Sequence, residues 1–291
     1  MFGKQISDLM IKPGKSPVFE TPEKYNLEYE DVTFKTTDGI TLSGWLVKGG
    51  TSKVIIQSHF GVQCSRCGFT QEGKGMMKNA LWTSDIHFLN HAKYLTEAGF
   101  SVLMYDMRNH GNSEQTGWVS WGKDERKDVL AAVNFISSHQ DYSHANIGLL
   151  SICMGQGAST FAFGLEDMKQ FKNLKTMISV QPLTYDYFVK AMGLPNFLVN
   201  SGNKYNKEKR NTDLTGDAFL PYVKNIHVPT LVIQNSNDPM TNIDMVKQYF
   251  DALDVEKEML WLDLEKKRGA AYSWLGENSE PILNWFEKYL K

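Results

Sequence analysis

The sequence predicts an α/β protein built on a doubly wound, mostly parallel sheet of about eight strands with a small helical lid. Six short apolar runs have the length of buried strands and lie at 54–56, 102–105, 147–152, 177–180, 230–233 and 259–262. Segments with helical spacing of apolar residues lie between and after them, at 84–98, 123–137, 155–163, 245–253 and 281–290. This alternation is typical of right-handed βαβ units.

The chain is predicted to consist of one core with two additions. Residues 1–28 mix glycine, proline and charge without clear periodicity and are interpreted as a lead-in segment. The core is expected at 29–182 and 227–291, and it starts with a hairpin whose strands alternate around the Thr37-Asp38-Gly39 turn. Residues 183–226 interrupt the rhythm and are predicted as a lid insertion, with a surface decoration as the alternative.

Composition restricts the class of protein. A formal net charge of −2 argues against a nucleic-acid partner. No stretch approaches the ~20 apolar residues that cross a bilayer, and the start of the chain does not resemble a signal peptide. Three cysteines favour a reducing cytoplasm over a disulfide framework. We therefore expect a cytoplasmic protein with a small-molecule substrate and no membrane partner. The sequence leaves open whether it forms a homodimer.

The sequence indicates neither a cofactor nor a metal. It contains no phosphate loop and no dinucleotide fingerprint after the first parallel strand. Cys64 and Cys67 form a C-x-x-C, but no second pair of ligands completes a zinc site. These two thiols lie in the long connection at 62–83, where we interpret them as loop residues at a pocket entrance.

The strongest local signal surrounds Cys153. An apolar strand runs into Ser151-Ile152-Cys153-Met154-Gly155, and a segment of small residues follows. This is the pattern of a nucleophile elbow, in which small residues flank the nucleophile because a strained turn brings a helix close to a strand. The amides at the start of that helix favour a thiolate and a developing oxyanion.

This segment resembles the elbow of the α/β-hydrolase superfamily, with cysteine in place of serine as in dienelactone hydrolases. Three further pieces, at 58–61, 105–113 and 233–239, are similar to the superfamily's oxyanion loop, its turn after the fourth strand and its acid-bearing loop. The order and spacing of these motifs extend the resemblance over roughly residues 30–290.

The resemblance implies a hydrolase or acyl-transfer enzyme acting on a small, largely apolar ester, thioester or lactone. Cys153 would be the nucleophile and Asp238 the triad acid. The backbone N–H groups of Met154 and Phe60 would form the oxyanion hole. The Lys267–Trp274 stretch also resembles a subgroup with cysteine elbows and an Arg-Phe-x-x-Tyr sequence there.

The sequence departs from the superfamily where the triad histidine should stand. No histidine follows His227, and residues 265–272 read Glu-Lys-Lys-Arg-Gly-Ala-Ala-Tyr. Three hypotheses stay open. His59 supplies the base, or Cys153 is a thiolate stabilised by the helix start and Arg268, or the fold serves ligand binding or a cyclase or lyase reaction. Arg268, Tyr272 and Tyr187 are the expected substrate-binding side chains.

Overall fold

The structure is a computed structural model, and it describes residues 2–12, 14, 17–61, 63–72, 85–215 and 218–291. Its described part contains an eight-stranded sheet in the order β1-β2-β6-β3-β7-β8-β9-β10. The strands are β1 (Tyr29–Lys35), β2 (Thr41–Val47), β3 (Lys53–Ser58), β6 (Ser101–Tyr105), β7 (Asn146–Ile152), β8 (Leu174–Val180), β9 (Thr230–Asn235) and β10 (Lys257–Leu262). A small antiparallel pair, β4 (Gly68–Phe69) and β5 (Ile86–His87), lies apart from this sheet.

The sheet is mostly parallel, as predicted. Only the β1–β2 and β2–β6 pairs are antiparallel among the pairs of the main sheet, and the remaining pairs, from β6 to β10, are parallel. The predicted hairpin at the start of the core is the β1–β2 pair. Each of the six predicted strands overlaps a strand of this sheet, because continuous apolar runs are what a sheet covered on both faces requires.

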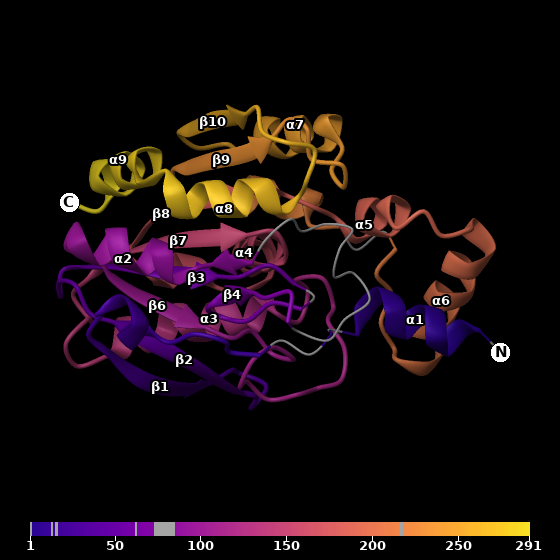
Figure 1. Ribbon diagram of the computed structural model, residues 1–291, viewed down its shortest axis with the longest axis horizontal. Coiled ribbons are helices and arrows are strands. Elements are labelled where there is room, and N and C mark those ends of the chain that lie inside the picture. The colour runs from indigo at the N-terminus through magenta and orange to yellow at the C-terminus, as the bar shows by residue number, and fades with distance from the viewer. Residues whose placement is uncertain (1, 13, 15–16, 62, 73–84, 216–217) are drawn as a thin grey trace.

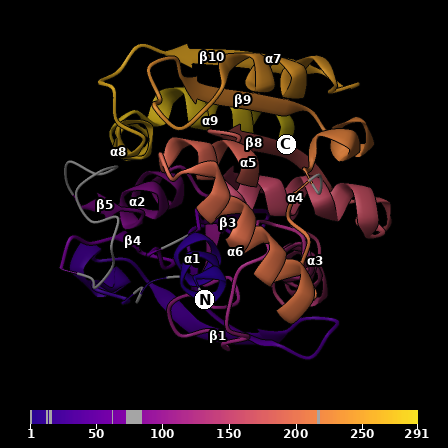
Figure 2. The ribbon, with the colours of Figure 1, turned by 90° about the vertical axis from the view of Figure 1, so that its right-hand side faces the viewer.

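Helices cover both faces of the sheet (Figure 2). One group comprises α2, α8 and α9, which contact one another, and the other contains α3 and α4, with α7 joined to them through η3. Their bounds are α2 (Leu89–Glu97), α3 (Arg126–Ser138), α4 (Met154–Leu165), α7 (Ile243–Asp251), α8 (Gly269–Glu277), α9 (Ser279–Tyr289), η1 (Pro22–Tyr25), η2 (Met168–Gln170) and η3 (Leu220–Asn225). The α8 helix was not predicted, because it follows a polar stretch without helical periodicity.

The lead-in segment contains a helix that the sequence pattern did not predict. This helix, α1 (Gly3–Ile11), packs along α6 (Asn196–Lys209), although residues 12–195 lie between them in the sequence (Figure 1). A Cβ on Gly202 would lie 2.4 Å from Met10 Cε, so glycine permits the close approach. With α5 (Tyr185–Ala191), these helices form a layer at one end of the molecule.

Part of the predicted long connection at 62–83 cannot be compared with the structure, because residues 62 and 73–84 lie outside the described part. The described part of the chain contains no helix long and apolar enough to cross a membrane.

Close packing of α4 on β3 places the elbow. A Cβ on Gly155 would lie 2.3 Å from the Ser58 carbonyl oxygen, closer than any real contact. We expect Gly155→Ala to lower the free energy of unfolding by about 2 kcal/mol or more, since the helix must move away from the strand. Urea denaturation of the purified protein measures this loss.

Gly157→Ala in the same helix is the matched control. Its added Cβ would first meet the Phe219 ring at 3.3 Å, and a ring can shift where a backbone oxygen cannot. We expect a change within about 1 kcal/mol. Equal losses in the two variants would contradict the importance of the α4–β3 approach.

Candidate active site

Cys153 forms a strained turn between β7 and α4. Its φ of 53° and ψ of −107° are unusual for a residue with a side chain and cost about 1–3 kcal/mol. Backbone bonds hold this conformation: Cys153 N–H donates to the Val180 oxygen at 2.9 Å, and Gly157 N–H donates to the Cys153 oxygen at 3.0 Å. The turn therefore has the shape that the elbow pattern predicts.

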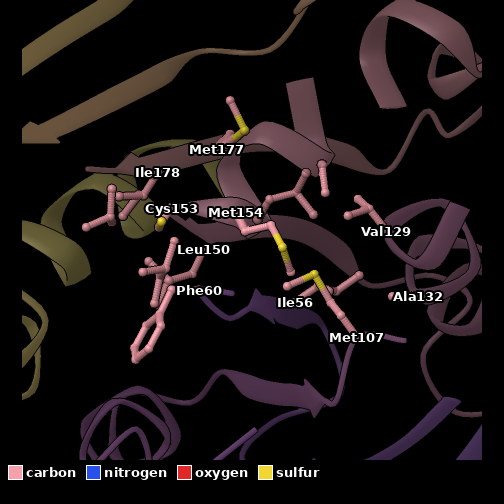
Figure 3. Close-up of a cluster of buried hydrophobic side chains, with 14 of the residues drawn as sticks. Ile56, Phe60, Met107, Val129, Ala132, Leu150, Cys153, Met154, Met177 and Ile178 are labelled. Carbon is pink, nitrogen blue, oxygen red and sulfur yellow. The ribbon is translucent and has the colours of Figure 1, made fainter. Parts of the chain in front are cut away.

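The sulfur lies in dry surroundings. Cys153 is 5% exposed, and Figure 3 shows it among apolar side chains that include Leu150, Phe60 and Ile178. Polar and charged neighbours of the sulfur act strongly there, because little water screens them.

Arg268 is a charged neighbour of the sulfur. It stands directly before α8, is 2% exposed, and lies within hydrogen-bonding reach of the Cys153 side chain. One guanidinium nitrogen pairs with the Asp238 carboxylate, and the other donates to the Gln181 carbonyl oxygen at 3.0 Å. Burial by itself would lower the pKa of Arg268, but the charges of Asp238 and Cys153 raise it above the usual value for arginine. Arg268 is therefore a permanent cation at the sulfur.

Asp238 is placed after β9 but is engaged on both oxygens. One oxygen accepts from the Arg268 guanidinium, and the other accepts from Met240 N–H at 3.0 Å. The residue is buried. Asp238 thus holds an arginine in the way that the acid of a triad holds a histidine.

Tyr272 on α8 is the second polar neighbour of the sulfur. Its ring stacks on that of Phe60 with centroids 4.7 Å apart, and its side chain interacts electrostatically with Cys153. Burial and, to a smaller extent, the facing Cys153 raise the pKa of Tyr272 well above its ordinary value, although Arg268 lowers it. The phenol therefore stays neutral near pH 7.

His59 does not have the contacts of a base for Cys153. Its Nδ1 bonds the Phe60 carbonyl oxygen at 2.7 Å, and its Nε2 accepts from Met107 N–H at 3.0 Å. Burial lowers the pKa of His59 to about 4, so the ring is neutral at pH 7. The hypothesis that His59 supplies the base therefore disagrees with the structure, because both ring nitrogens are already used by backbone groups.

No other histidine replaces it. All seven histidines lie within the described residues, and none of them hydrogen-bonds to Cys153. His91 and His110 are buried side chains whose bonds reach Gln57 and the Arg108 carbonyl oxygen. The polar neighbours of the sulfur are thus an arginine and a tyrosine, and no histidine hydrogen-bonds to it.

The two segments that carry the amides expected for an oxyanion hole lie against each other. Gly155 N–H donates to the His59 oxygen at 3.1 Å, which holds the loop after β3 against the first turn of α4. A Cβ on Gly61 would lie 2.6 Å from Met154 Sδ, so this loop packs directly on Met154. The Met154 amide is the first of α4 and has no partner inside the helix. Phe60 and Met154 therefore lie on adjoining segments.

Gln181 is a residue that sequence reasoning missed. It follows β8 with a φ of 50°, and its side-chain amide donates to the Arg268 carbonyl oxygen at 2.9 Å. Its side-chain oxygen accepts from Gln234 Nε2 at 2.9 Å. Gln181 therefore hydrogen-bonds both the backbone oxygen and the guanidinium of Arg268. Its place at the carboxyl end of a predicted strand was the available signal, but its conformation was not visible in the sequence.

Two other expectations concern side chains away from the sulfur. Cys64 and Cys67 are fully buried, so the interpretation as entrance thiols is wrong. They face Ser65, whose carbonyl oxygen accepts from the Cys64 thiol at 3.3 Å and whose hydroxyl lies 3.2 Å from the Cys67 sulfur. Tyr187 is partly buried on α5, and its expected contact with substrate stays a prediction.

Comparison with known proteins agrees with this architecture. No protein-family model and no curated protein matches the sequence. Among solved structures, an esterase of Pyrococcus furiosus superposes with a TM-score of 0.72 at 20% identity, covering 96% of this chain and 100% of the esterase. The fold is the α/β-hydrolase fold.

Two further structures share this fold. The α/β-hydrolase GrgF of Penicillium sp. sh18 has a TM-score of 0.62 at 18% identity and covers 91% of this chain and 98% of its own. A dienelactone hydrolase of Anabaena variabilis has a TM-score of 0.55 at 14% identity, with 91% and 99% coverage. At these identities the likeness establishes the fold alone.

The buried histidines predict acid sensitivity. Burial lowers the pKa of His59 to about 4 and those of His91 and His110 to about 3, against 6.5 for an unburied histidine. Below pH 6.5 the unfolded chain binds these protons and the native chain does not, so stability falls as the pH falls towards 4. Each histidine contributes up to about 1.4 kcal/mol per pH unit to this slope.

Urea unfolding between pH 7 and pH 4.5 measures the slope. His91→Gln replaces one of these rings with an amide that can still bond Gln57. The variant should show a slope smaller by up to about 1.4 kcal/mol per pH unit. An unchanged slope would contradict the assignment of a buried neutral His91.

The Arg268–Asp238 pair predicts strong energetic coupling. Removing one partner leaves the other charge buried and unpaired, so Arg268→Met and Asp238→Leu should each cost about 3–5 kcal/mol of stability. The double variant should lose clearly less than the sum, with a coupling of about 2 kcal/mol or more. Urea denaturation of the four proteins gives this coupling.

The exposed pair Lys204–Glu208 is the control for this cycle. Its side chains are 73% and 55% exposed and 3.8 Å apart. Its coupling should stay below about 1 kcal/mol. A coupling this small at Arg268–Asp238 would mean that water reaches the pair.

Proposed function

We propose that this protein is an acyl-transfer enzyme or hydrolase that uses Cys153 as its nucleophile. The observation that carries the proposal is the placement of a thiol in a strained elbow, at the start of α4 and beside the buried cation Arg268. The sulfur would attack the carbonyl carbon of a small ester, thioester or lactone and form an acyl-enzyme. Water or a second acceptor would then take the acyl group.

The electrostatics at the sulfur support an anionic nucleophile. A cysteine attacks as the thiolate and needs a base less than a serine does. The guanidinium of Arg268 and the Met154 amide at the start of α4 both stabilise negative charge there. The Asp238 carboxylate partly cancels the positive charge of Arg268, but its hydrogen bond also fixes the position of the guanidinium.

The surroundings of the sulfur support an apolar acyl group. Phe60 and Tyr272 present a stacked pair of rings beside Cys153. The amides of Met154 and Phe60 would donate to the oxyanion of the tetrahedral intermediate. Esterases and a dienelactone hydrolase with the same fold are in keeping with this chemistry. A working thiol also fits the reducing cytoplasm expected from the sequence.

A second function, ligand binding without turnover, is favoured by a different observation. No histidine bonds Cys153, so the usual relay of protons is missing. A protein that binds an acyl compound at the same site would need no relay. A cyclase or lyase reaction would likewise not depend on one.

Acylation of Cys153 tests the proposal. The protein is exposed briefly to p-nitrophenyl esters and small lactones, and its mass is measured before and after peptide mapping. We expect an acyl adduct on Cys153 that forms within seconds. Cys153→Ser should react about a thousandfold more slowly, because a serine hydroxyl needs the base that this site lacks.

Cys67→Ala is the matched control, since it removes a buried thiol outside the elbow and should still form the adduct. Absence of any adduct on Cys153 would overturn the proposal. In that case, an increase in Tm with the same compounds would support the binding function.

A further inference from the structure

We infer that the acyl donor is a thioester and that the acyl acceptor is a second thiol, so that Cys153 exchanges acyl groups between sulfur atoms. This inference rests on the proposed function and names its substrate class. The inference follows from the described polar side chains at the sulfur, none of which is placed to give or take a proton near pH 7.

The described polar side chains that interact with the sulfur are Arg268 and Tyr272, and both keep their protons near pH 7. Arg268 is held by the Asp238 carboxylate on one side and by the Gln181 carbonyl oxygen on the other. Tyr272 is packed against Phe60 in the core, and burial first of all raises its pKa well above the ordinary value. A guanidinium and a phenol in such surroundings stabilise charge but do not act as acid and base near pH 7.

The two groups that would serve as bases are occupied. Asp238 accepts from Arg268 and from Met240 N–H, and His59 bonds backbone groups through both ring nitrogens. Neither can take a proton from water without losing a buried partner, which is costly.

The missing proton donor selects the leaving group. When an alkyl ester is cleaved, the alcohol has to leave with a proton, because an alkoxide is a poor leaving group in water. A thiol has a pKa of about 8.5 and leaves readily as the thiolate. Of the three candidate substrates, a thioester is therefore the one that this site can cleave without a general acid.

The missing base selects the acceptor in the same way. Water must give up a proton to attack the acyl-enzyme, and among the described side chains Asp238 and His59 are both engaged by other groups. An acceptor thiol is already partly ionised in solution near pH 7. The acyl-enzyme is therefore expected to react with a thiolate and not with water.

The complete exchange balances without any proton transfer. The Cys153 thiolate attacks the thioester carbonyl, a C–S bond forms to Cys153, and the C–S bond to the donor breaks with release of the donor thiolate. The acceptor thiolate then attacks the acyl-enzyme, and the Cys153 thiolate is released. A permanent cation such as Arg268 fits this cycle, because the sulfur returns to the same charge each time.

The test compares one acyl group on three donors, using the full-length protein. S-butyryl-N-acetylcysteamine, ethyl butyrate and p-nitrophenyl butyrate are mixed with the protein, and the mass of the Cys153 peptide is followed with and without 10 mM 2-mercaptoethanesulfonate as acceptor. We expect an adduct from the thioester and none from ethyl butyrate. The adduct should decay about a hundredfold faster with the acceptor thiol. Cys153→Ala gives the uncatalysed background.

Three outcomes are distinguishable. An adduct that decays as fast in buffer as with thiol, or rapid acylation by ethyl butyrate, overturns thiol exchange and leaves the proposed function standing. No adduct from any donor, including the activated p-nitrophenyl ester, overturns the proposed function itself. A thiol-dependent adduct from the thioester supports both.

Arg268→His adds a test of the physical cause. It places an imidazole next to Asp238, where it can be oriented as a base. If proton transfer is what the site lacks, the adduct of this variant should decay in buffer at least tenfold faster than that of the wild type. A folded variant, shown by an unchanged circular dichroism spectrum, with unchanged decay would overturn this explanation.

Discussion

The buried guanidinium of Arg268 connects three loops of this protein at the sulfur of Cys153. Its contacts reach the turn after β8 through Gln181, the loop after β9 through Asp238, and the elbow after β7 through Cys153. A charge without water is costly unless it is paired and hydrogen-bonded. The cation therefore holds the carboxyl ends of three neighbouring strands in one arrangement, and the same arrangement puts a positive charge at the sulfur.

Backbone proximity provides the second constraint. The elbow stores strain at Cys153, and this strain persists because α4 is pressed against β3 at Gly155. The same contact brings the loop that carries Phe60 to the first turn of the helix. Backbone strain and close packing together thus hold the Cys153 thiol in a fixed direction and leave it almost fully buried.

Tyr272 and His59, two described ionisable side chains of this site, both stay neutral near pH 7. Catalytic centres usually contain a group that titrates near the working pH. Here the pKa of Tyr272 is raised well above its ordinary value, and that of His59 is lowered to about 4, so neither changes charge near pH 7. A thiolate that leaves and returns as a thiolate is the chemistry that such fixed charges support.

Local patterns in the sequence determined much of the fold and part of the site. Apolar runs and helical spacing predicted the strands of the sheet from β3 to β10 and most core helices, because each pattern depends on neighbours along the chain. The elbow at Cys153 and the lack of a later histidine were also visible there. The tertiary structure alone decided the partners of His59, the burial of Cys64, the role of Gln181 and the packing of α1 on α6. These features depend on contacts between residues that are not neighbours in the chain, as in the pair of Asp238 with Arg268. The free energy of such contacts comes from burial and charge pairing, which local sequence patterns do not show.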